Sequence, residues 1–311
     1  MSLRELNEVV TREVGRVVVG QDEVITSIVV ALAARGHVLL EGVPGVAKTL
    51  IATSLARALG IESTRVQFTP DMLPSDLTGT MTLRGGELSF RPGPVFTNLL
   101  LADEINRTPP KTQAALLEAM QEKQVSVEGT PEGLPDPFCV VATQNPVEYE
   151  GTYPLPEAQL DRFLLQVEVG YPSEEAEREI LALGHRGTEP ATLERIERVA
   201  GTAEIETARE DLDRTTVSEE VAAYVVALVR RTRELPSVTL GASPRAAVHL
   251  MSAAKAAARL ADRDFVTPDD VVAMAPGVLR HRIVLSPEAA LERYSRSDAV
   301  YAALGAVPVP K

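Results

Sequence analysis

A glycine-rich segment that could bind phosphate stands between an apolar run and a helical pattern. It reads Gly42-Val43-Pro44-Gly45-Val46-Ala47-Lys48-Thr49 and follows the apolar residues 38–40. Backbone N–H groups in such a turn point inward, and the N-terminus of the following helix favours negative charge. The Lys48 ammonium would reach the β- and γ-phosphates of a nucleotide, and the Thr49 hydroxyl would ligate Mg²⁺.

Position 47 departs from the general phosphate-loop pattern G-x-x-x-x-G-K-[ST], which has glycine where this chain has Ala47. Alanine is harmless there if its backbone angles are helical, and costly if φ is positive. The alternative interpretation is an ordinary strand, turn and helix with an unrelated lysine. The preceding strand and the Lys48-Thr49 pair at the start of the helix argue against that alternative.

Two carboxylates, Asp103 and Glu104, end the apolar run at residues 99–102. Such a run is typical of a central parallel strand, and ligands bind at the carboxyl ends of strands in open α/β sheets. Asp103 would hold Mg²⁺ through its water shell, and Glu104 would orient and polarise the attacking water. Alone the pair is a weak signal, because many strands end in a solvated acidic turn. Its place downstream of the glycine-rich segment strengthens it.

A second apolar run, residues 138–143, leads into Gln144, Asn145 and Pro146. An amide at the end of this strand could hydrogen-bond the γ-phosphate or the attacking water. The alternative is that Asn145 only begins a turn before Pro146, which ends the strand. The two preceding motifs favour the first interpretation.

Two arginines follow at helix ends. Arg162 closes a short helix that begins at Pro156, and an arginine there could stabilise a transferring phosphoryl group, often from a neighbouring molecule. An ordinary surface ion pair is the alternative. Ser243 and Pro244 are typical of an N-cap and first helical residue, so Arg245 lies in a first turn, where the helix dipole disfavours a cation. Either a bound phosphate or an acidic side chain would offset it.

Together these segments resemble the AAA+ ATPases and, within them, the MoxR family. The resemblance covers nearly the whole chain, from Val19-Gly20-Gln21 to the region around Arg282. It rests on the segments at residues 42–49, 67–76, 103–107, 142–146 and 241–246, and Ala47 in the first segment is part of the resemblance.

The resemblance implies a role for each site residue. Gly42 to Thr49 correspond to Walker A, Asp103 and Glu104 to Walker B, Asn145 to sensor 1, Arg162 to the arginine finger and Arg245 to sensor 2. It also places Gly20, Gln21 and Leu50 among the nucleotide-binding residues. The implied cofactors are ATP and Mg²⁺, with Thr49 and Asp103 at the metal.

The activity that the resemblance implies is ATP hydrolysis at a subunit interface, coupled to remodelling or activation of a partner protein. Arg162 would come from the next subunit of a ring, most often a hexamer, while Arg245 could act within its own subunit or across the interface. MoxR-like proteins are associated with separate von Willebrand factor A domain proteins and with metal insertion or enzyme maturation. No such domain is expected in this chain.

Two other functions are considered. A nucleic-acid motor is one, since relatives with similar inserts drive helicases, but a formal net charge of −13 argues against a sequence-independent grip on nucleic acid. A nucleotide-bound scaffold with negligible turnover is the other. The presence of Glu104, Asn145 and Arg162 argues against it.

The elements that position these residues form an α/β pattern over residues 1–172, for which we expect a nucleotide-binding P-loop AAA+ core, a parallel sheet sandwiched by helices. Helices are predicted at 2–15, 21–35, 48–60, 110–123 and 156–162, and strands at 37–41, 64–68, 98–103, 138–143 and 164–168. Two segments, 81–90 and 125–138, are predicted β-hairpins. Local sequence alone favours surface decoration for them, whereas the resemblance implies inserts that face a ring pore.

A boundary at Tyr171-Pro172-Ser173 precedes residues 173–311, for which we expect a C-terminal all-α lid domain. Helices are predicted at 173–183, 190–200, 217–234, 243–261, 268–280 and 286–302. The polar and acidic residues 201–216 are predicted to be a loop.

The remaining composition is typical of a soluble, cytoplasmic ATPase. The 311 residues suffice for one large or two medium domains. The single cysteine, Cys139, fits a reducing compartment, and the four histidines show no metal-ligand spacing. No apolar run reaches the roughly 18 residues of a membrane helix, and the start of the chain predicts a charged amphipathic helix rather than a signal peptide.

Overall fold

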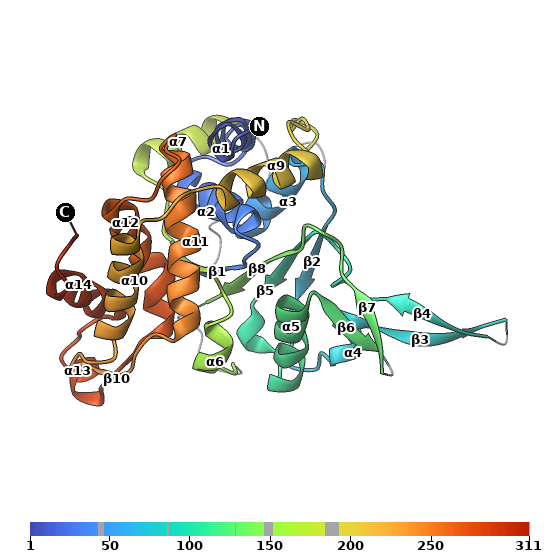
Figure 1. Ribbon diagram of the computed structural model, residues 1–311. Helices are drawn as coiled ribbons and strands as arrows, with labels where there is room; N and C mark the ends of the chain where they lie inside the picture. Colours follow the sequence, from blue (N-terminus) through green and yellow to red (C-terminus); the bar gives the residue numbers. More distant parts are fainter. Residues whose placement is uncertain (43–46, 86, 128, 146–151, 184–192, 311) are drawn as a thin grey trace.

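The computed structural model describes residues 1–42, 47–85, 87–127, 129–145, 152–183 and 193–310. A five-stranded sheet with the order β2-β5-β8-β1-β9 lies at its centre (Figure 1). All neighbouring strands in it are parallel. The strands are β1 (Val38–Gly42), β2 (Ser63–Gln67), β5 (Leu99–Asp103), β8 (Cys139–Gln144) and β9 (Leu165–Val169). The predicted strands are confirmed, with ends shifted by about one residue.

Alternation along the strands divides the apolar side chains between the two faces of the sheet. Val38 and Leu40 pack in the cluster that contains the apolar residues of α1, α2 and α3, whereas Leu39 and Leu100 pack in the cluster that contains those of α5. The core helices are α1 (Leu3–Val14), α2 (Asp22–Ala33), α3 (Lys48–Ala58), α4 (Pro74–Thr78), η1 (Ile105–Arg107), α5 (Pro110–Glu122) and α6 (Glu157–Leu160). The predicted sandwich of helices around a parallel sheet is confirmed.

Both predicted hairpins are present and leave the same side of the core (Figure 1). One pairs β3 (Gly79–Arg84) with β4 (Glu87–Pro92), and the other pairs β6 (Gln124–Val127) with β7 (Thr130–Gly133), both antiparallel. Near the tip of the longer hairpin, Leu83 and Leu88 stand opposite each other and are 71% and 65% exposed. The body of the protein does not cover these two leucines, so they are accessible to a partner.

The C-terminal part is a helical lid with one short two-stranded pair, β10 (Val238–Leu240) and β11 (Val284–Leu285). Its helices are α7 (Glu174–Leu183), α9 (Thr202–Asp213), α10 (Glu219–Arg231), α11 (Pro244–Leu260), α12 (Pro268–Leu279), η2 (Arg280–Arg282), α13 (Pro287–Leu291) and α14 (Arg296–Ala306). Serine hydroxyls cap four of them, at Ser218, Ser243, Ser286 and Ser295.

Three lid predictions are wrong in part. Residues 201–216, predicted as a loop, contain α9. Its buried side chains follow helical spacing, at Ile205, Ala208, Arg209 and Leu212. Because one of these four is an arginine, the apolar periodicity of the helix is incomplete in the sequence. The predicted helix at 190–200 falls partly outside the described residues, and residues 194–200 form a turn followed by backbone without regular secondary structure. The helix predicted at 286–302 is interrupted between α13 and α14, where Ser295 caps the second helix.

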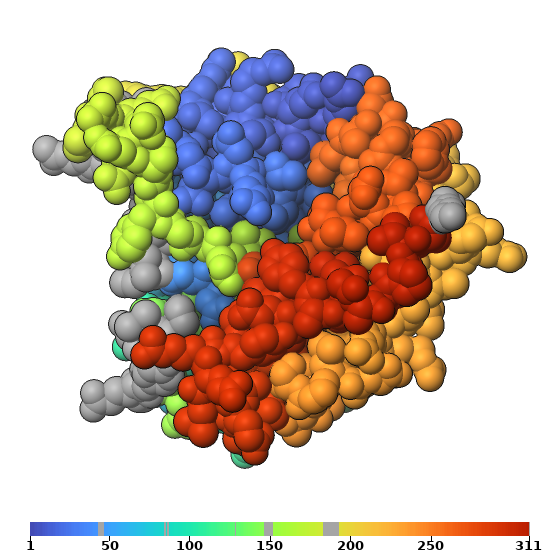
Figure 2. Space-filling model, turned by 90° about the vertical axis from the view of Figure 1, so that its left-hand side faces the viewer, coloured from blue at the N-terminus to red at the C-terminus, as the bar shows by residue number. Residues whose placement is uncertain are grey.

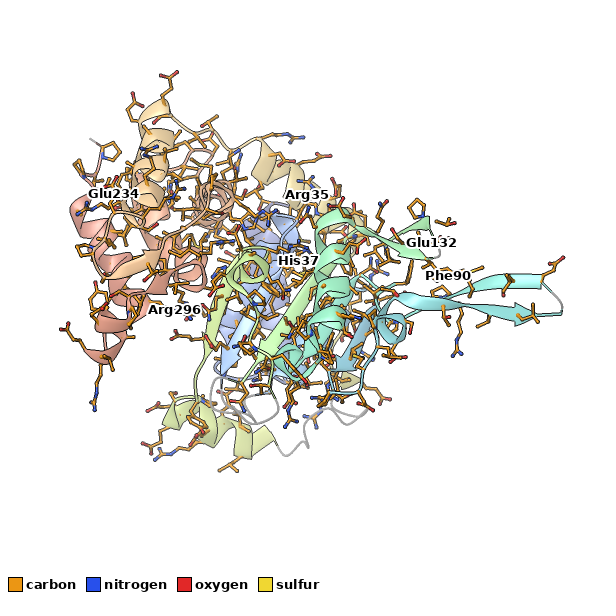
Figure 3. The ribbon with its side chains drawn as sticks, turned by 90° about the horizontal axis from the view of Figure 1, so that it is seen from below. Arg35, His37, Phe90, Glu132, Glu234 and Arg296 are labelled. Atoms are coloured by element: carbon orange, nitrogen blue, oxygen red, sulfur yellow. The ribbon has the colours of Figure 1, made fainter. Side chains whose placement is uncertain are left out.

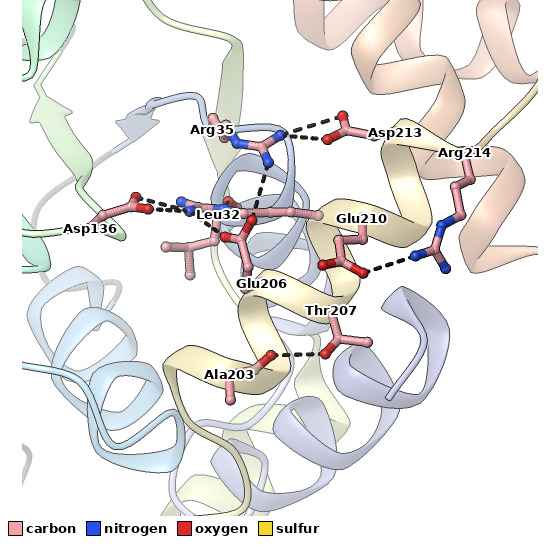
Figure 4. Close-up of polar contacts among 10 residues, drawn as sticks. Leu32, Arg35, Asp136, Ala203, Glu206, Thr207, Glu210, Asp213 and Arg214 are labelled. Carbon is pink, nitrogen blue, oxygen red and sulfur yellow. Dashed lines mark hydrogen bonds and ion pairs between the residues drawn. The ribbon is translucent and has the colours of Figure 1, made fainter.

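The buried Arg209 anchors α9 against the core, and Figure 4 labels its partners Leu32, Asp136 and Glu206. Its guanidinium donates to Asp136 at 2.9 Å, to Glu206 at 3.1 Å and to the carbonyl oxygen of Leu32 at 3.2 Å. A guanidinium that is 3% exposed needs such partners, because an unpaired buried charge is costly. The arginine therefore connects α9 with α2 and with the loop that follows the second hairpin.

Core and lid share one apolar cluster, which combines residues of α1, α2 and α3 with residues of α9, α10, α11 and α12. Figure 2 shows the N-terminal helices (blue) beside the C-terminal helices (orange to red) on one face. The division at residue 172 stays a prediction. Across the described ranges, no helix combines the length and hydropathy needed to cross a membrane.

Candidate active site

The carboxyl edge of the sheet carries the lysine of the glycine-rich segment. Lys48 begins α3, and its Nζ donates a hydrogen bond to the carbonyl oxygen of Gly42 at 2.9 Å. Burial lowers the pKa of the Lys48 ammonium, while the nearby Asp103 and Glu104 carboxylates act in the opposite direction. These three side chains therefore share one electrostatic environment, as the sequence motifs predict.

The rest of the segment is only partly visible. Val43, Pro44, Gly45 and Val46 lie outside the described residues. Ala47 has φ 59° and ψ 21°, which is the left-handed region. Of the two cases considered for this position, the structure has the costly one, in which alanine takes a conformation that glycine adopts more easily.

Thr49 and Leu50 follow Lys48 in the first turn of α3. Thr49 is half-buried there, and its carbonyl oxygen accepts a hydrogen bond from the Thr53 hydroxyl at 2.8 Å. Leu50 is 6% exposed and belongs to the apolar cluster under α3. Its side chain therefore fixes the helix to the core, and any contact with a nucleotide is left to its backbone.

Gly20 and Gln21 lie where the chain enters α2, beside the start of the lid. Gly20 has a φ of +73°, and a Cβ there would stand 2.9 Å from the Cβ of Ala176, in α7. Gln21 is 8% exposed and occupies the N-cap position of α2. Glycine is thus required at position 20 both by backbone angle and by close packing.

Asp103 ends β5 and is held on both carboxylate oxygens. Oδ1 accepts a hydrogen bond from the Thr143 hydroxyl at 2.6 Å, and Oδ2 forms an ion pair with Arg65 Nη2 at 2.8 Å. The side chain is 13% exposed. A carboxylate fixed in this way is preorganised to receive a metal-bound water.

Glu104 follows in a left-handed conformation, with φ 58° and ψ 50°. Its Oε2 accepts from Gln67 Nε2 at 2.7 Å and from Arg107 Nη1 at 3.2 Å. The Glu104 backbone N–H donates to the Thr143 hydroxyl at 2.9 Å. Strained backbone of this kind is typical of functional sites, and here it turns the side chain away from the strand direction.

Thr143 is a site residue that the sequence analysis missed. Its hydroxyl donates to Asp103 and accepts from the Glu104 backbone, so it connects both carboxylate residues to β8. The available signal was a polar residue inside the apolar run 138–143, and Thr143 is indeed fully buried. Asn145 lies just beyond the same strand and is 7% exposed. Because β8 lies between β1 and β5, Asn145 stands at the same edge as Lys48 and Asp103.

The arrangement fits a nucleotide with Mg²⁺. The described residues contain no group of three or more His, Cys, Asp or Glu side chains that could hold a metal ion by themselves. Mg²⁺ characteristically keeps several waters and binds through one or two carboxylates plus substrate phosphates. The Thr49 hydroxyl, the Asp103 carboxylate and the half-buried Lys48 ammonium are the groups that could supply the protein side of such a site.

The two candidate arginines lie elsewhere. Arg162 precedes β9, and Arg35 and His37 precede β1; the Leu164 N–H donates to the His37 carbonyl oxygen at 2.8 Å. Figure 3 shows Arg35 and His37 in the middle of the molecule, between the lid and the hairpins. A cavity of about 140 Å³ lies there, lined by Arg35 to His37, the end of α5, Arg162, and Arg245 and His249 of α11. Because the strands are parallel, this is the amino edge of the sheet.

The contacts of these arginines are sparse. Arg162 donates through Nη1 to the carbonyl oxygen of Leu117, and its buried Nε has no hydrogen-bond partner among the described residues. Arg245 is 41% exposed and stands 3.9 Å from Asp161. The acidic side chain considered as an alternative to phosphate near Arg245 is therefore present, at long ion-pair distance.

The structure thus divides the candidate residues between two edges. Lys48, Asp103, Glu104 and Asn145 come together at the carboxyl edge, whereas Arg162 and Arg245 come together at the amino edge. Because a strand rises about 3.3 Å per residue, a strand of the length of β1 separates the two edges of the sheet by roughly 15 Å.

A phosphate-loop lysine at the carboxyl edge of a parallel sheet, an acidic strand end and a helical lid define an AAA+ ATPase. Residues 37–165 match the ATPase family associated with various cellular activities (AAA), and residues 230–302 match the AAA lid domain. The chain is 45% identical to Chaperone MoxR1 of Mycobacterium tuberculosis, over 96% of this chain and 81% of that protein. It belongs to the MoxR family of AAA+ ATPases.

Two further similarities agree with this assignment. The chain is 48% identical to the Bacillus subtilis protein YeaC, over 96% of this chain and 92% of that protein. A crystal structure of a protein from Cytophaga hutchinsonii superposes with a TM-score of 0.91 at 42% identity, and covers 99% of this chain and 96% of that one. The similarity therefore extends over core and lid together.

Proposed function

We propose that this chain binds ATP with Mg²⁺ at the carboxyl edge of its sheet and hydrolyses it there with Glu104 as the base. The observation that carries this proposal is the shared environment of Lys48, Asp103 and Glu104, in which Thr143 connects the two carboxylate residues. Lysine provides positive charge for the β- and γ-phosphates, and Asn145, just beyond the end of β8, would hydrogen-bond the γ-phosphate or the attacking water.

In this proposal each residue has a separate task. Glu104 accepts a proton from a water molecule whose oxygen attacks the γ-phosphorus, and the bond to the β-phosphate oxygen breaks to leave ADP. Lys48 and Thr49 bind the phosphate and metal side of the substrate, and Asp103 holds the metal through water. Mg²⁺, when bound, neutralises charge that develops on the phosphate oxygens.

Arg162 and Arg245 belong, in our proposal, to the site of a neighbouring subunit. Their position at the amino edge supports this, because they share a cavity far from the lysine of their own chain. A guanidinium that docks on the γ-phosphate of another subunit stabilises charge in the transition state. Hydrolysis then requires assembly into a ring, for which we propose a hexamer.

The output that we propose is remodelling or activation of a partner protein in the cytoplasm. The Mycobacterium tuberculosis relative is named a chaperone, which supports the proposal that this chain acts on a client protein. The exposed Leu83 and Leu88 on the longer hairpin supply an apolar contact surface for it. A separate von Willebrand factor A domain protein, and a role in metal insertion or enzyme maturation, are part of the same proposal.

The test is Glu104→Gln, which keeps the size of the side chain and removes its basicity. We expect ATP binding and assembly to stay as in the parent, while phosphate release falls at least about 10²-fold. Arg91→Gln, an exposed change on the longer hairpin, is the control for turnover. Phosphate release at the parent rate by Glu104→Gln would contradict the base assignment.

The same variant tests the proposed output. Held in its ATP-bound state, Glu104→Gln should retain a client or a von Willebrand factor A domain partner that the ADP-bound parent releases. If the parent itself binds ATP but shows no measurable phosphate release, the protein is a nucleotide-bound scaffold instead.

A further inference from the structure

Asp161 ties the short helix before Arg162 to the lid. It is the C-cap residue of α6, and its side chain is 16% exposed. Its carboxylate accepts a hydrogen bond from Arg282 Nε at 2.8 Å and from the Ser243 hydroxyl at 2.8 Å, and Arg245 stands 3.9 Å away. One side chain thus faces three lid groups.

Arg282 makes this connection rigid. Its side chain is 1% exposed, and besides Asp161 it donates to the carbonyl oxygens of Val278 and Phe163 and contacts Nδ1 of His249. The Asp161 carbonyl oxygen accepts a further bond from Arg282 Nη2 at 3.2 Å. A buried guanidinium with this many partners fixes the position of the backbone around it.

Ser243 transmits the same restraint to α11. Its hydroxyl caps the N-terminus of α11, accepting from the Ala246 N–H at 3.4 Å, and donates to Asp161. Arg245 lies two residues further along the first turn. A shift of Asp161 would therefore move the start of the helix that carries Arg245.

We propose that Asp161 is a positioning residue that holds Arg162 and Arg245 as one preassembled pair of guanidinium groups. Arg162 is its neighbour in the chain, Arg245 stands 3.9 Å from it on the helix that Ser243 caps, and both arginines line the same cavity of about 140 Å³. The pair is aimed at a single phosphate of an adjacent subunit. This inference rests on the proposed function, in which these arginines act across the subunit interface.

The expected consequence is a loss of rate without a loss of substrate binding. Misplacing catalytic groups by about 1 Å can cost about 10²-fold in rate. Asp161→Asn should therefore lower kcat by about 10²-fold, while KM for ATP and the affinity for a fluorescent ATP analogue stay within about twofold. Asp161→Glu, which keeps the charge, should retain more activity than Asp161→Asn.

Mixing subunits locates the defect. Asp161→Asn subunits keep an intact phosphate site, and Glu104→Gln subunits keep an intact arginine pair, so mixed assemblies of the two should regain activity. Mixed assemblies of Asp161→Asn with Arg162→Ala should regain none, because both lack a working pair. A role of Asp161 in its own subunit's site would give no recovery with Glu104→Gln, and would overturn the proposal.

Loss of the Asp161 carboxylate also leaves the buried Arg282 without its counter-charge, so stability needs its own controls. Asp270→Asn removes a comparable lid ion pair, with Arg263 at 2.5 Å, away from the cavity. Ser243→Ala removes the hydroxyl that joins Asp161 to α11, and Ser218→Ala removes an equivalent cap from α10. Ser243→Ala should lower kcat severalfold, whereas Ser218→Ala and Asp270→Asn should not lower it in assemblies that stay folded.

Each outcome decides a separate point. If Arg162→Ala turns over at the parent rate, the proposed supply of arginines is wrong, and the role of Asp161 is wrong with it. If Arg162→Ala is inactive but folded Asp161→Asn turns over at the parent rate, only the role of Asp161 is overturned. Should Asp161→Asn fail to fold, an equal effect of Ser243→Ala and Ser218→Ala on kcat would overturn it.

Discussion

At the carboxyl edge of the sheet Lys48 stands beside the carboxylates of Asp103 and Glu104, whereas at the amino edge Arg162 and Arg245 line a cavity with the imidazole of His249. The first edge combines both signs of charge, as binding of a metal and a triphosphate requires. The second gathers cationic groups, and the acid nearest Arg245, Asp161, is already bonded to Arg282 and Ser243.

In our proposal, one chain carries two halves of a site that it does not complete itself. Opposite ends of parallel strands cannot meet within a subunit, because the sheet stands between them. We propose that the residues at the carboxyl edge act within the chain, and that the two arginines at the amino edge act on a neighbouring subunit.

The largest expected effect comes from removing one residue at each edge. Lys48→Ala should abolish nucleotide binding, and Arg162→Ala should lower kcat by about 10³-fold while ATP still binds. In mixed assemblies, about a quarter of the interfaces pair an intact pocket with an intact arginine, so part of the activity should return. Phosphate release by the separate and mixed proteins measures this.

Lys111→Ala, an exposed lysine at the start of α5, serves as the control and should bind and hydrolyse ATP as the parent does. Confirmed mixed assemblies without any recovery would contradict the supply of Arg162 to a neighbouring subunit, because Arg162 would then have to act within its own subunit.

A smaller effect, a loss of stability, should appear when the pH is lowered, because His37 and His249 are buried at the amino edge. Burial lowers the pKa of His37 to about 4 and that of His249 to about 4. His37 is neutral when folded, since Nδ1 accepts from the Val140 N–H at 3.0 Å while Nε2 faces the Met120 carbonyl oxygen at 3.1 Å. As the pH falls, the histidine takes up its proton in the unfolded chain before it does so in the folded one. Its contribution to the unfolding free energy is therefore fully present above about pH 6.5 and is lost as the pH drops toward 4.

Between pH 7 and pH 5 His37 alone should cost about 2 kcal/mol of unfolding free energy. Urea unfolding at the two pH values measures this loss. His37→Gln, which can keep both hydrogen bonds, should show a weaker dependence on pH. An unchanged dependence would mean that His37 does not create the acid sensitivity of this edge.

The smallest effect concerns the backbone of the carboxyl edge. Ala47 has a positive φ of 59°, so Ala47→Gly removes strain of about 1–2 kcal/mol but adds freedom to the unfolded chain. We expect a net gain in stability of about 1 kcal/mol or less, with unchanged ATP affinity. Thermal unfolding compares this variant with Ala52→Gly, inside α3, which should be destabilised instead. Destabilisation by Ala47→Gly would argue against the left-handed conformation.

Much of this comparison could be predicted from the sequence. The strands follow from short apolar runs, and the carboxyl edge follows from motifs that stand directly after those runs. The hairpin at Gly85 follows from its turn residues and alternation, and the capped lid helices from their Ser-Pro and Thr-Pro starts.

What the sequence could not supply depends on contacts between distant segments. The helix α9 was missed because Arg209 occupies a buried position, which its partners Asp136, Glu206 and the Leu32 carbonyl oxygen make tolerable. Thr143 was missed because its role depends on the register of β5 against β8. The location of Arg162 and Arg245 at one cavity depends on how α6 and α11 pack.

Opposite placement of the two half-sites also restricts symmetry. In a twofold dimer one surface patch faces its own copy, so a patch that carries only one half-site cannot complete a pocket, whereas head-to-tail contacts join the two edges. An open row of subunits then always contains one fewer complete pocket than it has members. A closed ring has no terminal subunit with an incomplete pocket, so ATP turnover per subunit should rise as open rows become rings.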